Sequence, residues 1–211
     1  MLEKLGQPGY TRITKPDWEA VQQLDAIIVA GNEAPVIAEL GVGIGATTIQ
    51  FATRMANKGS IHIFDFAESV EELRRDLADR GFINVIPHGN TGRHWDSYHW
   101  SLAKMLDEEK PDTTFDLIYI DGAHTYLHDA LAFFMCDRLL KVGGLMLFDD
   151  YEWSFSGSKY LTGKRHEYMT SEQEESKQIK RFVDQLVKTS IHYEETMPNK
   201  GFRKLSSSVK R

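Results

Sequence analysis

Pro35-Val-Ile-Ala-Glu-Leu-Gly-Val-Gly-Ile-Gly-Ala-Thr47 is the stretch that decides the fold. Residues 35–40 are mostly apolar and are predicted to form a buried strand, and residues 47–55 are predicted to form a helix. Between them, Gly41 permits a tight turn, and Gly43 lets a ligand approach the backbone without meeting a Cβ atom. A glycine turn that follows a strand and opens a helix is the setting in which α/β proteins bind nucleotides.

The same alternation of strand and helix continues along the chain. After a first helix that begins at Pro16-Asp17 and ends near Val29, further strands are predicted at 60–66, 83–87, 115–120 and 144–148, and further helices at 68–80, 98–109 and 126–140. The segments 191–195 and 202–205 are predicted to form a terminal antiparallel hairpin. Nearly continuous apolar strands that alternate with helices indicate an α/β fold with a mostly parallel sheet and helices on both faces.

The bulk properties fit one domain over residues 1–211, with 1–33 as an N-terminal helical extension. Residues 152–170 lack a clear period and are predicted to be a substrate loop. A capping box of Ser171 and Glu174 is predicted to open the next helix, and the 206–211 tail is predicted to be disordered.

Charge and composition narrow the class of protein. The formal net charge of −6 argues against a nucleic-acid partner, because such proteins present broad basic surfaces. No stretch approaches the roughly 20 apolar residues of a membrane span, and no signal peptide is evident. A cytoplasmic protein that does not bind membranes is therefore expected.

A carboxylate stands where a nucleotide ribose would need one. Asp65 ends the second predicted strand, 24 positions after Gly41, and an acid at this place takes the ribose hydroxyls of adenosine cofactors. The simpler interpretation is a structural turn with Asp65 as a helix cap. Gly41-x-Gly43-x-x-Ala46 also fits a dinucleotide fingerprint. The accompanying Tyr160-x-x-x-Lys164 is interpreted as coincidence, because Gly163 interrupts it.

Two short acidic runs close the fourth and fifth predicted strands. Ile120-Asp-Gly-Ala-His124 and Phe148-Asp-Asp-Tyr151 would meet at one sheet edge if those strands are neighbours, since parallel strands lie roughly 4.8 Å apart. Three carboxylates and an imidazole could then seat a hard divalent cation and a general base. Taken singly, each could instead be a turn residue or a helix cap.

Together, the glycine turn, Asp65 and the acidic runs resemble the class I S-adenosylmethionine-dependent methyltransferases over roughly residues 35–205. The resemblance implies a Rossmann-like, seven-stranded, mostly parallel sheet with a C-terminal antiparallel hairpin. Asp121-Gly-x-His124 with Asp149-Asp150-Tyr151 is most similar to the metal-dependent O-methyltransferases of natural-product sugars, of the macrocin and mycinamicin type.

The resemblance implies roles for the matching residues. Metal ligands would be Asp121, Asp149 and Asp150, and the base would be His124. Residues placed at the cofactor are Glu39, Gly41, Gly43 and Thr47 toward its methionine end, Asp65 and Phe66 at its ribose and adenine, and Asn90 and Asp121 nearby. Asn90 departs from the family pattern, since many members have an acid there. The short region before the first strand means that the macrolide substrate does not transfer.

The function expected from the sequence is an S-adenosylmethionine-dependent O-methyltransferase that uses Mg²⁺ or Mn²⁺. Its substrate would be a hydroxyl of a small molecule, a sugar or glycosylated natural product. The alternatives are a metal-independent small-molecule methyltransferase and a catalytically silent methyltransferase-like binding subunit, with a nicotinamide dehydrogenase last. Proteins of this resemblance are often oligomeric, which leaves a homo-oligomer open.

Overall fold

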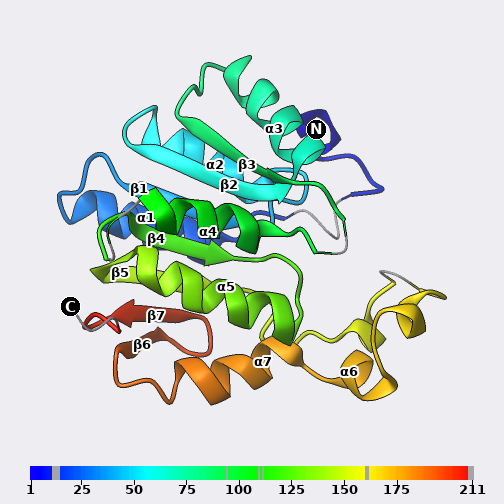
Figure 1. Ribbon diagram of the computed structural model, residues 1–211. Helices are drawn as coiled ribbons and strands as arrows, with labels where there is room; N and C mark the ends of the chain where they lie inside the picture. The colour runs from blue at the N-terminus through cyan, green and yellow to red at the C-terminus, as the bar shows by residue number, and fades with distance from the viewer. Residues whose placement is uncertain (11–14, 94, 109, 111, 160–161, 209–211) are drawn as a thin grey trace.

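The computed structural model describes residues 1–10, 15–93, 95–108, 110, 112–159 and 162–208 (Figure 1). Within this part of the chain the strands form a single sheet in the order β3-β2-β1-β4-β5-β7-β6. The strands are β1 (Val36–Leu40), β2 (Ser60–Phe66), β3 (Val85–Asn90), β4 (Phe115–Ile120), β5 (Leu140–Phe148), β6 (Tyr193–Met197) and β7 (Gly201–Lys204). The helices are α1 (Trp18–Val29), α2 (Ala46–Met55), α3 (Ala67–Ala78), α4 (Tyr98–Glu108), α5 (Tyr126–Leu139), α6 (Ser171–Glu175) and α7 (Gln178–Phe182).

The pairing confirms the predicted sheet. Strands β1 to β5 pair in parallel, while β7 pairs antiparallel with both β5 and β6. The order reverses between β1 and β4, because β1 leads outward to β2 and β3 on one side and the chain returns to β4 on the other. Such a reversal opens a crevice at the carboxyl ends of the two strands, where α/β proteins bind ligands.

Helices cover both faces of the sheet, and α4 and α5 lie in front of it in Figure 1. Successive residues of a strand point to opposite faces, so the two cores alternate along each strand. Ile37 of β1 packs with α1, α2 and α3, whereas Ala38 and Leu40 pack with α4, α5 and α7. The strands are apolar on both sides for this reason.

Several boundaries differ from the predictions. Strand β3 begins at Val85 rather than at residue 83, and its Pro87 is tolerated because β3 is an edge strand. Strand β5 begins at Leu140, directly after α5, because the paired register with β4 shifts by a bulge before Leu145. The capping box of α6 lies one residue earlier than predicted, between Thr170 and Gln173.

Two segments lie outside the regular alternation of strands and helices: residues 152–170 after β5, and the end of the chain. Residues 152–170 contain two short 3₁₀ turns, Phe155–Gly157 and Arg165–Glu167, and Tyr160 of the dehydrogenase-like pair lies outside the described residues. In the 206–211 tail, Ser206 and Ser208 form hydrogen bonds with His192 and Asp137, and residues 209–211 lie outside the described residues. Among the described helices, none has the length and apolar character needed to cross a bilayer.

Candidate active site

The glycine turn brings β1 into direct contact with the end of β4. Gly41 has φ +86°, and a Cβ atom placed on it would lie 2.0 Å from the carbonyl oxygen of Asp121. Gly43 also has positive φ, at +51°, and a Cβ there would meet nothing within 4 Å. The turn therefore needs glycine at position 41 for packing, while Gly43 leaves an open backbone surface.

Glu39, the last polar residue of β1, is a buried carboxyl. Its side chain is 2% exposed, and among the described residues no hydrogen-bond donor reaches its Oε2 atom. Burial raises the pKa of Glu39 to about 8, and the negative charges of Asp65 and Asp17 add to the rise. A buried carboxyl oxygen without a partner is costly, so a positively charged ligand group at this place would be strongly favoured.

Asp65 holds the glycine turn from β2. Its carboxylate accepts hydrogen bonds from the backbone N–H of Val42 at 2.9 Å and of Phe66 at 2.7 Å. The Phe66 ring is 53% exposed and lies close to Gly92, where a Cβ atom would be 3.1 Å from it. Asn90 is buried beside them at the end of β3 and accepts a hydrogen bond from the N–H of Gly92. An exposed aromatic ring and a buried amide thus stand next to the acid.

Thr47, in the first turn of α2, is buried, and its hydroxyl accepts a hydrogen bond from the N–H of Asp17 at 3.0 Å. Asp17 in turn caps α1 through the N–H groups of Glu19 and Ala20. The structure thus uses the Thr47 oxygen to hold the start of α1, while its O–H remains a donor.

The ends of β4 and β5 bring an imidazole and two carboxylates together. Asp121, His124 and Asp150 each offer a ligand atom, and these atoms all lie within 4.8 Å of one another. His124 Nδ1 is 3.2 Å from Asp150 Oδ2. Both His124 and Asp150 have left-handed backbones, with φ of +54° and +58°. Such conformations are uncommon outside glycine and concentrate at functional sites.

Asp149 stands apart from this group of three. Its Oδ2 atom accepts a hydrogen bond from the Tyr119 hydroxyl at 2.9 Å, and its Oδ1 atom is 3.8 Å from Lys200 Nζ. The Tyr119 hydroxyl is also 3.3 Å from Asp121 Oδ2. The structure therefore gathers two of the three predicted ligands with His124, and it turns the third carboxylate toward a phenol and a lysine.

Negative charge accumulates at this sheet edge. Burial raises the pKa of Asp121 well above its usual range, and the carboxylates of Asp149, Asp150 and Glu39 raise it further. Burial also raises the pKa of Asp150, although His124 opposes that rise. A divalent cation would offset this repulsion, and two carboxylates with an imidazole form a donor set that holds such ions. The residues fit the implied metal.

The loop that carries His124 is fixed by a buried acid. Asp129, in the first turn of α5, accepts hydrogen bonds from the Thr125 N–H at 2.7 Å and from the Tyr98 hydroxyl at 2.8 Å. Above His124 lies the Trp153 ring, with centroids 5.0 Å apart. Trp153 in turn contacts the buried Phe155 at 4.6 Å.

Sequence reasoning missed three of these residues. Tyr119 could have been found, because it lies two positions before Asp121 in a strand and so shares its face. Trp153 was not singled out within the predicted substrate loop of residues 152–170. Lys200, in the turn between β6 and β7, carried no signal, since nothing in the sequence places that turn beside α1 and β5. Its Nζ atom lies 2.6 Å from Asp17 and 2.8 Å from Glu19.

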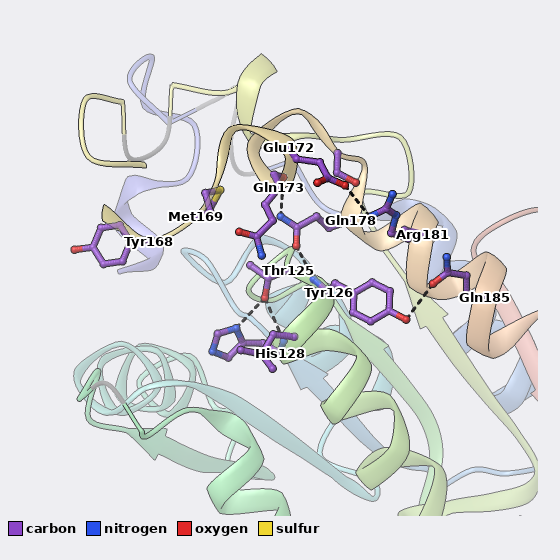
Figure 2. A pocket seen from close by; sticks show the side chains of 12 residues that line it. Thr125, Tyr126, His128, Tyr168, Met169, Glu172, Gln173, Gln178, Arg181 and Gln185 are labelled. Atoms are coloured by element: carbon purple, nitrogen blue, oxygen red, sulfur yellow. Dashed lines mark hydrogen bonds and ion pairs between the residues drawn. The ribbon is translucent and has the colours of Figure 1, made fainter. Parts of the chain in front are cut away.

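A cavity of about 480 Å³ lies between the start of α5 and the segment 168–185 (Figure 2). Figure 2 shows Gln178 reaching from the segment 168–185 to the start of α5, where its Oε1 atom accepts a hydrogen bond from the Tyr126 N–H at 2.8 Å. The Tyr126 hydroxyl donates to Gln185 Oε1 at 3.1 Å. Thr125, which follows His124 in the chain, forms part of the same cavity wall. Three glutamines line the cavity together with other polar and aromatic side chains, and Thr125 is the lining residue nearest in the chain to His124.

Comparison with known proteins agrees with this fold. A family model described as a methyltransferase domain matches residues 38–151, from β1 through the acidic pair. A methyltransferase from Geobacter sulfurreducens is 15% identical with a TM-score of 0.56, over 97% of this chain and 87% of that one. A candidate caffeoyl-CoA O-methyltransferase from Staphylococcus aureus is 15% identical with a TM-score of 0.63, over 95% and 88%.

A third similar structure is the O-methyltransferase TomG from Streptomyces achromogenes, which is involved in tomaymycin synthesis and was solved in complex with S-adenosylmethionine. It is 18% identical with a TM-score of 0.53, over 92% of this chain and 91% of that one. At these identities the likeness concerns the fold. No curated protein matches the sequence.

Proposed function

The chain belongs to the methyltransferase domain family, and from this premise we propose that it is an S-adenosylmethionine-dependent, divalent-metal-dependent O-methyltransferase of a small hydroxylated molecule. The observation that carries the proposal is the convergence at one crevice of three features: the glycine turn, the buried Glu39, whose Oε2 atom has no hydrogen-bond partner among the described residues, and the group of Asp121, His124 and Asp150.

Residues of β1, β2 and β3 fit the parts of the cofactor. Glu39 would receive its ammonium group, Asp65 its ribose hydroxyls, and Phe66 with Asn90 its adenine. The open backbone at Gly43 would lie against its methionine end, with Gly41 shaping the turn, Thr47 beside it and Asp121 at the β4 side. Bound S-adenosylmethionine would supply an electrophilic methyl group on a sulfonium.

The acidic edge would prepare the acceptor hydroxyl. A divalent cation held by Asp121 and Asp150 would lower the pKa of the hydroxyl and fix its direction. His124, 3.2 Å from Asp150, stands where it could accept the hydroxyl proton as general base. The Asp149 side chain would complete the ligand set if it left its hydrogen bond with the Tyr119 hydroxyl and rotated toward the cation. The ammonium group of Lys200 would compensate its negative charge.

The arrangement also supports a second assignment for His124, as a metal ligand. An imidazole in the donor set favours Mn²⁺ over Mg²⁺, because Mg²⁺ takes oxygen ligands almost exclusively. In that case Asp149 would stay with Tyr119 and a different group would take the proton. The two assignments differ in which substitution weakens metal binding.

Isothermal titration with S-adenosylhomocysteine, with and without Mg²⁺, tests the cofactor. Absence of cofactor binding would refute the proposal. Titration with Mn²⁺ then tests the site: Asp121→Asn and Asp150→Asn are expected to weaken binding by at least about tenfold, while Asp107→Asn on the exposed side of α4 should not. If Asp149→Asn weakens it and His124→Gln does not, His124 is the base, and its loss should lower the rate by about 10²–10⁴.

For the acceptor we propose a sugar or glycosylated natural product. The cavity of Figure 2 supports this class, because glutamine amides, hydroxyls and the Tyr126 and Tyr168 rings suit neutral rings with many hydroxyl groups. A panel of glycosides and catechols, scored for methyl transfer, tests it. Transfer to catechols alone would refute the sugar acceptor. Activity unaffected by EDTA would favour a metal-independent methyltransferase.

A further inference from the structure

We propose that Tyr151 is a positioning residue for the metal site: it ties the end of β5 to α7 and the turn after it, and so holds Asp150 against Asp121 and His124. This inference rests on the proposed function, since it concerns the same group of ligand atoms. Tyr151 directly follows the Asp149-Asp150 pair and itself contacts none of the reacting groups that we have named.

The Tyr151 hydroxyl uses all of its hydrogen-bonding capacity on one short stretch of helix. It donates to Asp184 Oδ1 at 2.7 Å and accepts from Lys180 Nζ at 3.2 Å and Lys188 Nζ at 3.1 Å. The two ammonium groups also lie over the ring, 4.5 and 4.9 Å from its centroid. Charged partners strengthen these hydrogen bonds, and cation–π contacts add to them.

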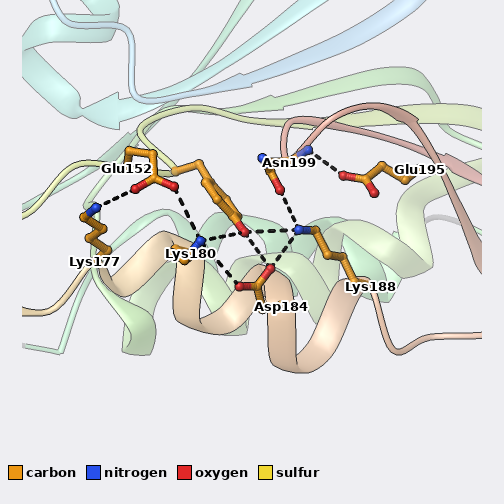
Figure 3. A network of polar contacts seen from close by, with 8 residues as sticks. Glu152, Lys177, Lys180, Asp184, Lys188, Glu195 and Asn199 are labelled. Carbon is orange, nitrogen blue, oxygen red and sulfur yellow. Dashed lines mark hydrogen bonds and ion pairs between the residues drawn. The ribbon is translucent and has the colours of Figure 1, made fainter.

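A π turn explains how three residues of one helix meet at one phenol. Val183–Val187 form this turn directly after α7, and the N–H of Lys188 bonds to the carbonyl oxygen of Val183. A π turn is wider than an α turn, so residues spaced four apart return to nearly the same face. Figure 3 shows Lys180, Asp184 and Lys188 converging in this way. Single π turns are rare and are often found at functional sites.

The same lysine ties down the other side of the acidic pair. Lys188 Nζ donates to Asn199 Oδ1 at 2.5 Å, and Asn199 precedes Lys200 in the turn between β6 and β7. Lys200 lies 3.8 Å from Asp149 (Figure 3 shows the Lys188–Asn199 contact). The network therefore reaches Asp150 through Tyr151 and Asp149 through Lys200. Contacts with the same helix thus help to position both carboxylates.

Asp150 needs such support because its backbone is in the left-handed region, at φ +58°. This conformation is unfavourable for a residue that carries a side chain, and it persists where neighbouring contacts enforce it. The N–H of Trp153 bonds to the Asp150 carbonyl oxygen at 2.9 Å on one side, and the Tyr151 anchor acts on the other. Release of the anchor would let the Asp150 carboxylate move away from His124.

The test compares Tyr151→Phe with Tyr193→Phe. Tyr193 is a matched control, since its hydroxyl also donates to a carboxylate, Asp137, at 2.7 Å, but away from the ligand atoms. Mn²⁺ binding is measured by electron paramagnetic resonance without cofactor or acceptor. Tyr151→Phe is expected to bind Mn²⁺ about tenfold more weakly, with an unchanged Kd for S-adenosylhomocysteine, whereas Tyr193→Phe should lower thermal stability alone.

The outcomes separate this inference from the proposed function. If the wild type binds Mn²⁺ and Tyr151→Phe binds it equally well, the positioning role is overturned and the metal site stands. If the wild type binds no Mn²⁺, the metal part of the proposed function fails. The crystal structure of Tyr151→Phe then decides the positioning role: a shifted Asp150 supports it, and an Asp150 still about 3.2 Å from His124 overturns it.

Discussion

Replacement of Glu39 by glutamine is expected to remove a proton that the protein releases when it binds its cofactor. Burial raises the pKa of Glu39 to about 8, from an ordinary value of 4.5. At pH 7 a carboxyl with a pKa of 8 is protonated in about 0.9 of the molecules. The positive ammonium of S-adenosylhomocysteine would favour the ionised form, so binding should expel about this fraction of a proton.

The assay is isothermal titration of S-adenosylhomocysteine in two buffers with different enthalpies of ionisation, which yields the number of protons released. The wild type should release about 0.9 proton more than Glu39→Gln at pH 7, and the variant should bind more weakly. Glu194→Gln, on the exposed face of β6, is the matched control and should behave as the wild type. Equal proton release by the wild type and Glu39→Gln would refute the reasoning.

The same shift affects stability without any ligand. Between pH 4.5 and 8 the folded state keeps the Glu39 proton while the unfolded state has lost it, so the free energy of unfolding falls as the pH rises through this window. The total is on the order of 5 kcal/mol, from a shift of about 3.5 pKa units at 1.36 kcal/mol each. Urea unfolding of Glu39→Gln should lack this decline. A parallel decline in both proteins would contradict the assignment.

Three further changes test the packing, the histidine pair and the aromatic cover. Gly41→Ala is expected to abolish folding, because the new Cβ would lie 2.0 Å from a carbonyl oxygen, whereas Gly81→Ala at similar φ meets nothing within 4 Å and should cost about 1 kcal/mol in urea unfolding. His62 of β2 and His88 of β3 form a pair whose ring nitrogens lie 3.0 Å apart. Burial lowers the pKa of both to about 4, so the free energy of unfolding should fall as the pH falls from 6.5 toward 4, and His88→Phe should reduce this fall. An equal fall in the wild type and the variant would refute the assignment. Trp153→Ala is expected to raise the KM for the acceptor about tenfold, with S-adenosylhomocysteine binding unchanged, and equal effects on both ligands would contradict a role at the acceptor.

Much of the fold could be read from the sequence because the relevant forces are local. Strands covered on both faces are mostly apolar, so β2 and β4 were predicted with their observed bounds. Edge strands follow this rule less strictly, and for that reason the predicted bounds of β3 differ from the observed ones. The bulge that lengthens β5 depends on pairing with β4, which periodicity does not report.

The sequence by itself determined which chemical groups stand at the strand ends: the glycine turn, Glu39, Asp65 and the two acidic runs. Their spacing along the chain suffices because parallel strands all end at one edge of the sheet. Only the tertiary structure decided how these groups face one another. It set His124 beside Asp150, and it turned Asp149 toward Tyr119 and Lys200. The direction of a side chain depends on partners brought in by distant segments, here the β6–β7 turn, and no local pattern records such partners.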